Sequence, residues 1–407
     1  MSVTADPDSL RGARGDQTAT KADARGRTRV RDPRLDFFRG IAMFIILIAH
    51  TPGNFLGLWI PARFGFSDAT EIFVFCSGMA SAIAFASIYR TRGWWLGTVR
   101  TLFRVWQVYW AHIGIFLVTC TFMVALTRTG LFETDYVAKL NLYPFIFDPG
   151  PQLVGLMTLT YVPNYFDILP MYIVILALMP VVIALRRIGV WAAASLIVGL
   201  WLGANLLGWS LPAEPWSDRE WFFNPFGWAL VFYTGFFLMA GWLPRPPVDR
   251  RLVWLCLAIV LLIVPLAYFR IYLEVEPLLE WRRENRPWFQ KTDMGPLRFL
   301  HFIALAYLAW IAAGPVTPRI GRGTGLAGAI WGPILSVILK VGQQSLAVFA
   351  VSMVLARLLG VLIDVIDGSR WSVLAVNLLG FAILIGVAYF VAWIKGQPWR
   401  APRPTVP

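Results

Sequence analysis

Charged residues are scarce in this chain, and their scarcity excludes most soluble folds. Lysine, arginine, aspartate and glutamate make up 14% of the 407 residues, whereas hydrophobic residues make up 58%. A globular core stops growing at a few hundred residues, so a soluble protein could not bury this much apolar surface. The apolar residues form continuous runs of about 20, the length of a membrane-spanning helix. The strand-like alternation of a membrane barrel is absent.

Cysteine is equally scarce, and so are the motifs of common soluble enzymes. Cys76, Cys120 and Cys256 lie in apolar runs without metal-ligand spacing, so we expect buried free thiols and no metal site. The sequence contains no GxSxG elbow, HExxH zinc motif, P-loop or dinucleotide-binding GxGxxG. The net charge of +13 is better explained by basic cytoplasmic loops than by nucleic-acid binding, so no nucleic-acid partner is expected.

These features predict an all-α, polytopic membrane protein with about ten transmembrane helices bundled around a central groove. The short apolar stretch 327–340 ends at Lys340 and is interpreted as an interfacial amphipathic helix, with an eleventh span as the alternative. The ten expected spans are 36–55, 68–89, 100–126, 168–186, 190–209, 226–243, 252–270, 297–315, 342–363 and 372–394.

The chain divides by composition into three parts. Residues 1–30 are polar and basic and are expected to be a disordered cytoplasmic N-terminus; 31–395 form the membrane domain, and 396–407 a cytoplasmic tail. Basic residues concentrate in one alternate set of loops, which predicts that both termini are cytoplasmic. The opposite side has two long segments, 127–167 and 271–296, where functional loops would lie on the scaffold.

Two ionisable residues in the first span are the leading functional candidates. Arg39 and His50 are eleven residues apart, so they share one helix face and lie roughly 16 Å apart along the axis. An ionisable group inside the membrane is expensive and indicates function by default. The structural alternative is that Arg39 is an ordinary cytoplasmic anchor and His50 a hydrogen-bonded packing residue.

Two carboxylates open the second span. Asp68 and Glu71 share a helix face, and an antiparallel turn from the first span would bring them near His50. A carboxylate that accepts from one imidazole nitrogen raises the basicity of the other, so this group could deprotonate a hydroxyl. The alternative is that Asp68 caps the helix and Glu71 pairs with a neighbouring arginine.

The third span begins with further basic residues. Arg100 and Arg104 recur near helical spacing and would join Arg39 in a cluster at the cytoplasmic mouth. Guanidinium groups grip phosphates in bidentate fashion, so this cluster suits a phosphorylated ligand. Ordinary flanking charge is the alternative.

Four polar residues at the outer ends of later spans are candidate contacts to an acceptor or acyl group. Asn164 and Asp167 precede the fourth span, and Asp167 could instead cap that helix. Arg298 and His301 open the eighth span; Arg298 could pair with a carboxylate or hold the free carboxylate of a donor.

One segment resembles the first-span signature of acyltransferase type 3 membrane proteins, and five further segments, in order, resemble the OpgC family within that superfamily. The first has the superfamily's spacing of Arg39 and His50. The segments are RLDFFRGIAMFIILIAH, DATEIFVFCSGMASA, VPNYFDILPMYIVILALMP, NPFGWALVFYTGF, LRFLHFIALAYL and GQQSLAVFAVSMVLA.

This resemblance implies a bacterial inner-membrane acyltransferase. OpgC-type proteins are associated with succinylation of osmoregulated periplasmic glucans, and related enzymes take the acyl group from cytoplasmic acyl-CoA. The resemblance implies acyl-CoA, with succinyl-CoA the expected form, as donor, a periplasmic glucan or other glycan as acceptor, and the lipid bilayer as surroundings. Arg39, His50 and Arg104 match the superfamily's basic residues. A transporter of polysaccharide or anions and a purely structural protein are the alternatives.

Overall fold

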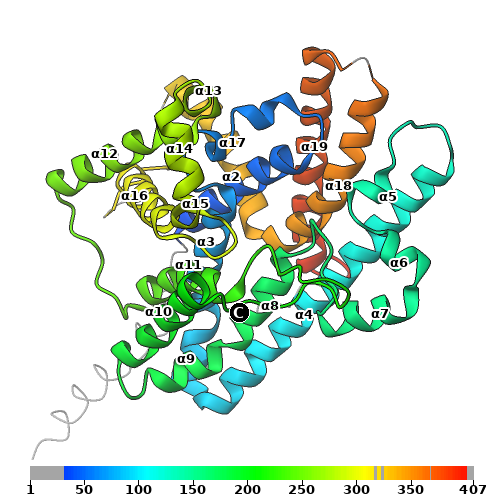
Figure 1. Ribbon diagram of the computed structural model, residues 1–407. Coiled ribbons are helices and arrows are strands. Elements are labelled where there is room, and N and C mark those ends of the chain that lie inside the picture. The colour runs from blue at the N-terminus through cyan, green and yellow to red at the C-terminus, as the bar shows by residue number, and fades with distance from the viewer. Residues whose placement is uncertain (1–31, 316–318, 322–324, 367, 401–407) are drawn as a thin grey trace, which may run out of the picture. The chain divides into compact units, whose positions relative to one another are not determined.

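The computed structural model describes residues 32–315, 319–321, 325–366 and 368–400. The expected N-terminal region 1–30 and the end of the tail, 401–407, lie outside the described residues. The compact unit Arg34–Pro407 is built from helices alone across its described part, with one isolated bridge between Pro212 and Glu220. The all-α prediction is confirmed, and Figure 1 shows the helices of this unit.

Within the described residues, seven helices are long and apolar enough to cross a membrane, so the expected count of about ten is not confirmed. The seven are Ala69–Arg128, Ile168–Leu185, Val190–Leu207 (α10), Arg250–Ala267 (α12), Gly325–Gln343 (α17), Ser345–Val365 (α18) and Arg370–Lys395 (α19). The segment Ile168–Leu185 consists of α8 (Ile168–Ala177) and α9 (Met179–Leu185).

Three further helices coincide with expected spans but are not among these seven. Helix α2 (Pro33–His50) has 18 residues and carries Arg34, Asp36 and Arg39. Helices α11 (Pro225–Ala240) and α16 (Pro296–Ala312) are apolar but have only 16 and 17 residues. Charge excludes the first of these helices and length the other two. In addition, the expected spans 68–89 and 100–126 are counted as one segment, and α17 is counted although it was not among the ten expected spans.

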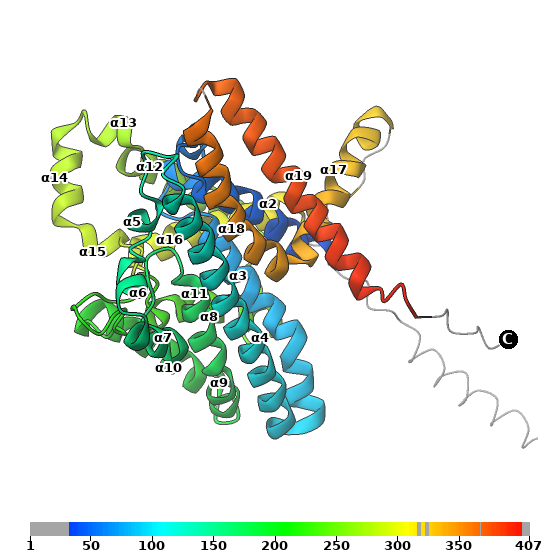
Figure 2. The ribbon, with the colours of Figure 1, turned by 90° about the vertical axis from the view of Figure 1, so that its right-hand side faces the viewer.

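The 60-residue segment Ala69–Arg128 contains two helical arms rather than one straight helix. It consists of α3 (Ala69–Ser81), a π-helical turn η4 (Ala82–Ala86) and α4 (Ser87–Arg128). Gly93 inside α4 has φ 84° and ψ 172°, which interrupts the helix and reverses the chain. Figure 2 shows the light-blue arm and the cyan arm of α4 lying side by side. The separate spans expected at 68–89 and 100–126 correspond to these arms.

Helix α17 is longer than the interfacial helix expected at 327–340. It has 19 residues and is apolar enough to cross a membrane, although Pro333 lies inside it. The helix is therefore long enough for the alternative prediction, an eleventh span.

Helices α3 and α11 approach closely through two glycines. A Cβ on Gly78 of α3 would lie 1.9 Å from the carbonyl oxygen of Phe232 on α11. Reciprocally, a Cβ on Gly235 of α11 would lie 2.3 Å from the carbonyl oxygen of Phe75 on α3. Membrane helices associate through small residues of this kind because close backbones pack well. This contact fixes α3, whose first turn carries the predicted carboxylates.

Helices α2 and α17 meet in the same way. A Cβ on Gly40 would lie 2.1 Å from the carbonyl oxygen of Ile338, and one on Gly342 would lie 1.8 Å from that of Asp36. Helix α18 follows α17 directly, and α18 and α19 pack side by side in Figures 1 and 2. The first half of α2 is therefore held against the last turns of α17, shortly before α18 begins.

The two long loop segments contain short helices that the hydropathy pattern did not predict. Helices α5 (Tyr136–Lys139), α6 (Tyr143–Phe147) and α7 (Pro149–Thr158) occupy the first segment. Helices α13 (Phe269–Tyr272), α14 (Glu276–Glu284) and α15 (Arg286–Phe289) lie in and beside the second.

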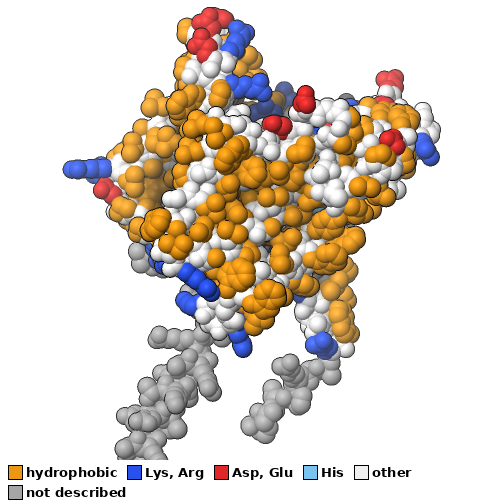
Figure 3. All heavy atoms as spheres, turned by 60° about the horizontal axis from the view of Figure 1, so that its bottom comes forward, with side chains coloured by type: hydrophobic (Ala, Val, Ile, Leu, Met, Phe, Trp, Pro, Cys, Tyr) orange, Lys and Arg blue, Asp and Glu red, His pale blue; other side chains and the backbone are white. Residues whose placement is uncertain are grey.

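The exposed surface and the cysteines suit a membrane protein. Hydrophobic side chains cover most of the face in Figure 3, and charged side chains lie near its margins. Leu262 on α12, for example, is 71% exposed. Such a surface is expected of helices that face lipid. The three cysteines are free and buried, as predicted.

Candidate active site

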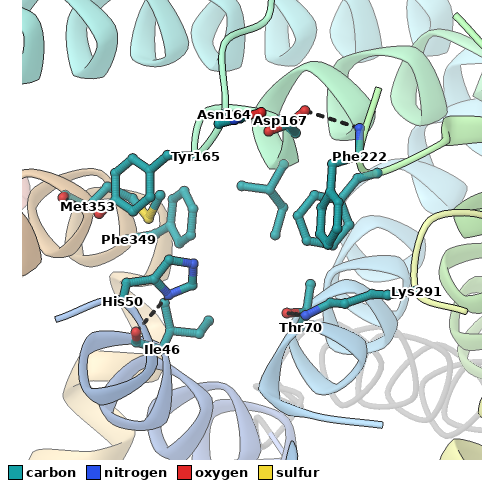
Figure 4. A pocket seen from close by; sticks show the side chains of 12 residues that line it. Ile46, His50, Thr70, Asn164, Tyr165, Asp167, Phe222, Lys291, Phe349 and Met353 are labelled. Carbon is teal, nitrogen blue, oxygen red and sulfur yellow. Dashed lines mark hydrogen bonds between the residues drawn. The ribbon is translucent and has the colours of Figure 1, made fainter. Parts of the chain in front are cut away.

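A cavity of about 290 Å³, lined by both apolar and polar side chains, lies where α2, α3, α8 and α18 meet the two long loop segments. It brings together three of the predicted site residues: His50, Asn164 and Asp167. Figure 4 shows His50 on one side and Lys291 with Thr70 on the opposite side. The complete lining is Ile46, His50, Thr70, Asn164, Tyr165, Asp167, Ile168, Phe222, Phe223, Lys291, Phe349 and Met353.

The His50 ring is oriented by its own helix. Its Nδ1 lies 2.9 Å from the carbonyl oxygen of Ile46, one turn earlier on α2. A carbonyl oxygen only accepts, so Nδ1 carries the proton and Nε2 keeps its lone pair. In Figure 4 the ring nitrogen that is not bonded to Ile46 points away from that carbonyl. His50 therefore offers a hydrogen-bond acceptor, and hence a base, at the cavity wall.

Asp68 and Glu71 do not orient His50 as expected, because the structure gives both carboxylates other partners. They form a capping box at the start of α3: Asp68 accepts from the Thr70 amide at 2.6 Å, and Glu71 accepts from the Asp68 amide at 2.8 Å. Their remaining oxygens pair with cations, Asp68 with Lys291 and Glu71 with Arg298, each at 2.6 Å. The structural alternatives for both residues are confirmed. The carbonyl of Ile46 takes the orienting role.

Lys291 belongs to the site, although its position was not singled out from the sequence. Its Nζ donates to Asp68 at 2.6 Å and to Thr70 Oγ1 at 3.3 Å. Its surrounding segment mixes both charge signs, which hid the residue among ordinary loop charges. The only signal was a lysine within an aromatic stretch of a long loop.

Asn164 and Asp167 line the cavity from the loop before α8. Asn164 accepts from Arg219 at 3.2 Å, and Asp167 accepts from the Phe222 amide at 3.2 Å. Asp167 is 3% exposed, and burial raises the pKa of its carboxyl to about 6. The carboxyl therefore carries a proton below about pH 6 and a charge above it.

Tyr165, between those two residues, is held in an uncommon conformation. Its φ of 90° is one that non-glycine residues rarely adopt. Its hydroxyl donates to the Met353 carbonyl at 2.5 Å, and its ring lies edge-on to His50 with centroids 5.5 Å apart. The Arg357 guanidinium lies 3.8 Å from its ring centroid. Such strain clusters at functional sites. No sequence pattern indicated this geometry.

A second polar group, here called the basic cluster, lies at the other end of α2 and comprises Arg39, Arg104 and Lys395. The Arg39 guanidinium donates to Ser345 Oγ on α18, while its Nε is buried without a hydrogen-bond partner among the described residues. Arg104 acts electrostatically on both Arg39 and Lys395. Lys395 donates to Gln344 Oε1 at 2.6 Å, next to Ser345. The sequence analysis did not predict Lys395 as part of the basic cluster.

Seven of the ten predicted site residues lie outside the cavity lining. Besides Asp68, Glu71, Arg39 and Arg104, which are described above, these are Arg100, Arg298 and His301. Arg100 places its guanidinium over the rings of Phe85 and Phe103, at 5.7 and 5.8 Å, rather than in the basic cluster. Arg298 binds Glu71, as described above.

The buried His301 is bound to the turn before α3. Its Nδ1 lies 2.7 Å from Ser67 Oγ and accepts from the Ser67 amide at 3.3 Å. Both Arg298 and His301 thus support the segment that carries Asp68 and Glu71.

The stripe from Arg39 to His50 faces the protein interior, but the cavity follows only part of it. Ile46 and His50 line the cavity, whereas Arg39 does not. Met43 lies between them on the same helix face and has no exposed surface. The buried Met43 is therefore one of the side chains that lie between the two polar groups along this face.

The fold and the site define a multi-pass α-helical membrane protein with a cavity that contains polar side chains near one end of its helices and a basic cluster at the other end of α2. The family described as OpgC protein matches residues 31–396, nearly the whole chain. The chain belongs to the OpgC family, so the predicted family is confirmed. No curated protein and no solved structure matches the chain.

Proposed function

We propose that this protein is a bacterial inner-membrane acyltransferase that moves a succinyl group from cytoplasmic acyl-CoA to a hydroxyl of a periplasmic glucan. Both termini would be cytoplasmic, and the cavity would open toward the periplasmic side. The OpgC family indicates a glucan-modifying, acyltransferase-like membrane protein. The transport alternative is not favoured by that membership.

The observation that carries the proposal is an imidazole lone pair on the wall of a cavity that also contains polar side chains. His50 Nδ1 is engaged by the Ile46 carbonyl, which leaves Nε2 to accept a proton. Tyr165 supplies an aromatic ring beside His50, and Phe222 and Phe223 supply aromatic rings elsewhere in the lining. Asn164 and Asp167 supply hydrogen-bonding groups that suit the hydroxyls of a sugar.

Acyl transfer then needs one base. The acceptor hydroxyl gives its proton to His50 Nε2 while its oxygen attacks the thioester carbonyl carbon. The tetrahedral species collapses, the carbon–sulfur bond breaks, and the departing thiolate takes the proton from the imidazolium. In a second route, Nε2 attacks the thioester carbonyl carbon, the carbon–sulfur bond breaks and the thiolate leaves. The acceptor hydroxyl then attacks the acyl-imidazole, its proton passes to the thiolate, and the carbon–nitrogen bond breaks to restore the imidazole. Both routes use the same lone pair.

The basic cluster would bind the coenzyme A end of the donor. Arg39, Arg104 and Lys395 would hold the phosphates of coenzyme A, since guanidinium and ammonium groups bind phosphate strongly. The eleven residues from Arg39 to His50 span roughly 16 Å, a distance suited to the pantetheine arm. Met43 would have to move aside for the arm to pass, and methionine is the most adaptable apolar side chain.

Replacing Arg39 with alanine is expected to weaken coenzyme A binding about 10- to 100-fold, the range for a lost charge-assisted hydrogen bond. Isothermal titration of coenzyme A against detergent-purified protein measures this directly. Arg100→Ala is the matched control, because Arg100 lies over Phe85 and Phe103 instead. An unchanged dissociation constant in Arg39→Ala would rule out the phosphate role.

The function itself is tested with purified protein, succinyl-labelled succinyl-CoA and periplasmic glucan. We expect label to appear on the glucan as an ester and free coenzyme A to be released in equal amount. A transporter would leave the label on the thioester. Such a result would overturn the proposed function.

A further inference from the structure

One cation in the cavity lining has more N–H donors than it has hydrogen-bond partners among the described residues. The Lys291 ammonium has three N–H donors, and two are used by Asp68 and Thr70. Its side chain remains 24% exposed and lines the cavity. Arg298, in contrast, is 13% exposed and is absent from the lining. Of the two cations that pair with the carboxylates of α3, Lys291 is therefore the one that a ligand in the cavity can reach.

Lys291 is also held firmly in place. Its backbone carbonyl accepts from Trp228 Nε1 at 2.9 Å, and Trp228 is fully buried in α11. Its ammonium lies 5.4 Å from the Phe223 ring centroid. A core tryptophan holds the backbone of Lys291, and a carboxylate and a hydroxyl hold its ammonium. The lysine therefore loses little conformational freedom when a ligand binds it.

The formal charges of the two ion pairs at Lys291 cancel, so an anion that enters the cavity is not repelled by a net negative charge there. Asp68 and Lys291 form one ion pair, and Glu71 and Arg298 form the neighbouring one. The four formal charges sum to zero. The Lys291 ammonium can therefore donate its third N–H to a ligand in the cavity, and the neighbouring groups carry no net negative charge.

We propose that Lys291 is the specificity residue that selects an acyl chain ending in a carboxylate. This inference rests on the proposed function, in which the reacting carbonyl lies at His50. Lys291 lies across the cavity from His50 (Figure 4), so it meets the far end of a short acyl chain rather than its carbonyl. Ile46, Ile168 and Phe349 line the same cavity and suit the methylene groups of the chain.

The test is a change in donor preference measured with a charge-neutral double variant, Lys291→Met/Asp68→Asn. Asparagine keeps the helix cap, and removing both charges leaves no unpaired ion. We compare kcat/KM for succinyl-CoA with kcat/KM for butyryl-CoA, whose chain has similar length and no charge. We expect wild type to prefer succinyl-CoA about 10- to 100-fold, and the variant to lose that preference.

The matched control is Lys139→Met/Asp364→Asn, which removes another lysine–aspartate pair, 3.8 Å apart and outside this cavity. It should keep the wild-type preference. If the Lys291 variant loses equal factors of kcat/KM for succinyl-CoA and for butyryl-CoA, Lys291 acts on the carbonyl that both donors share. That result would overturn the inference. An unaltered ratio would overturn it too.

Measurements on wild type keep the inference testable even if the variant does not fold. A wild-type enzyme that transfers succinyl and butyryl equally well contradicts the inference but leaves the proposed function intact. A wild-type protein that transfers neither group from its thioester contradicts the proposed function itself.

Discussion

A glutamine in place of His50 is expected to lower the rate of acyl transfer by about 10²- to 10⁴-fold, the usual contribution of a general base. Glutamine fills a similar volume and can still bond the Ile46 carbonyl, but its amide cannot accept a proton at neutral pH. Coenzyme A affinity should change little, because the basic cluster lies at the other end of α2. The readout is initial-rate transfer of label to glucan.

The matched control for His50→Gln is His112→Gln. His112 is a buried histidine of α4, 1% exposed and absent from the cavity lining. A loss of rate confined to the His50 variant supports the base. Near wild-type transfer by a folded His50→Gln protein would show that the base lies elsewhere.

Removing the Arg298 side chain is expected to destabilise the fold by about 3–5 kcal/mol, the cost of leaving a buried charge without its partner. Glu71 is 0% exposed, and its pair with Arg298 is 2.6 Å long. Arg298→Met should therefore lower the apparent melting temperature in detergent. The double variant Glu71→Gln/Arg298→Met should recover much of the loss, because it leaves no unpaired charge.

An exposed pair provides the control for this stability experiment. Arg283 and Glu276 lie 3.9 Å apart on α14 and are 67% and 66% exposed. Breaking an exposed pair costs at most about 1 kcal/mol, so Arg283→Met should melt almost as wild type does. Equal melting temperatures for Arg298→Met and Arg283→Met would contradict the buried-pair account.

The sequence predicted the groups that one helix presents by itself. Periodicity alone placed Arg39 and His50 on one face of α2, and that face is turned inward. Residue types alone predicted the α3 capping box as an alternative, since Asp68 and Glu71 stand at its first and fourth positions. Such local features depend on spacing within a few turns.

The sequence could not show which distant residues complete the site. Lys291 and Arg298 follow their partners Asp68 and Glu71 by more than 220 residues, so only the folded chain brings them together. For the same reason we wrongly expected a carboxylate to orient His50. Tyr165 has a positive φ and contacts Met353, His50 and Arg357, which are distant in sequence, and no local rule predicts such a conformation.

The span count of about ten was not confirmed, for a different physical reason. Hydropathy windows tolerate a few charges and do not see where helices end. Helix α2 carries three charged residues, and α11 is nearly all buried, so it can be short without exposing its backbone. Helix α17 reaches past Lys340, which we took as its end.

The most direct test of the central claim is an experimental structure of the protein with a non-hydrolysable thioether analogue of succinyl-CoA. The account predicts phosphates among Arg39, Arg104 and Lys395, a displaced Met43 side chain, and the acyl carbonyl in the cavity. A bound acceptor hydroxyl between that carbonyl and His50 Nε2 should lie about 3 Å from each. An analogue bound elsewhere, with the cavity empty and Met43 unmoved, would contradict the account.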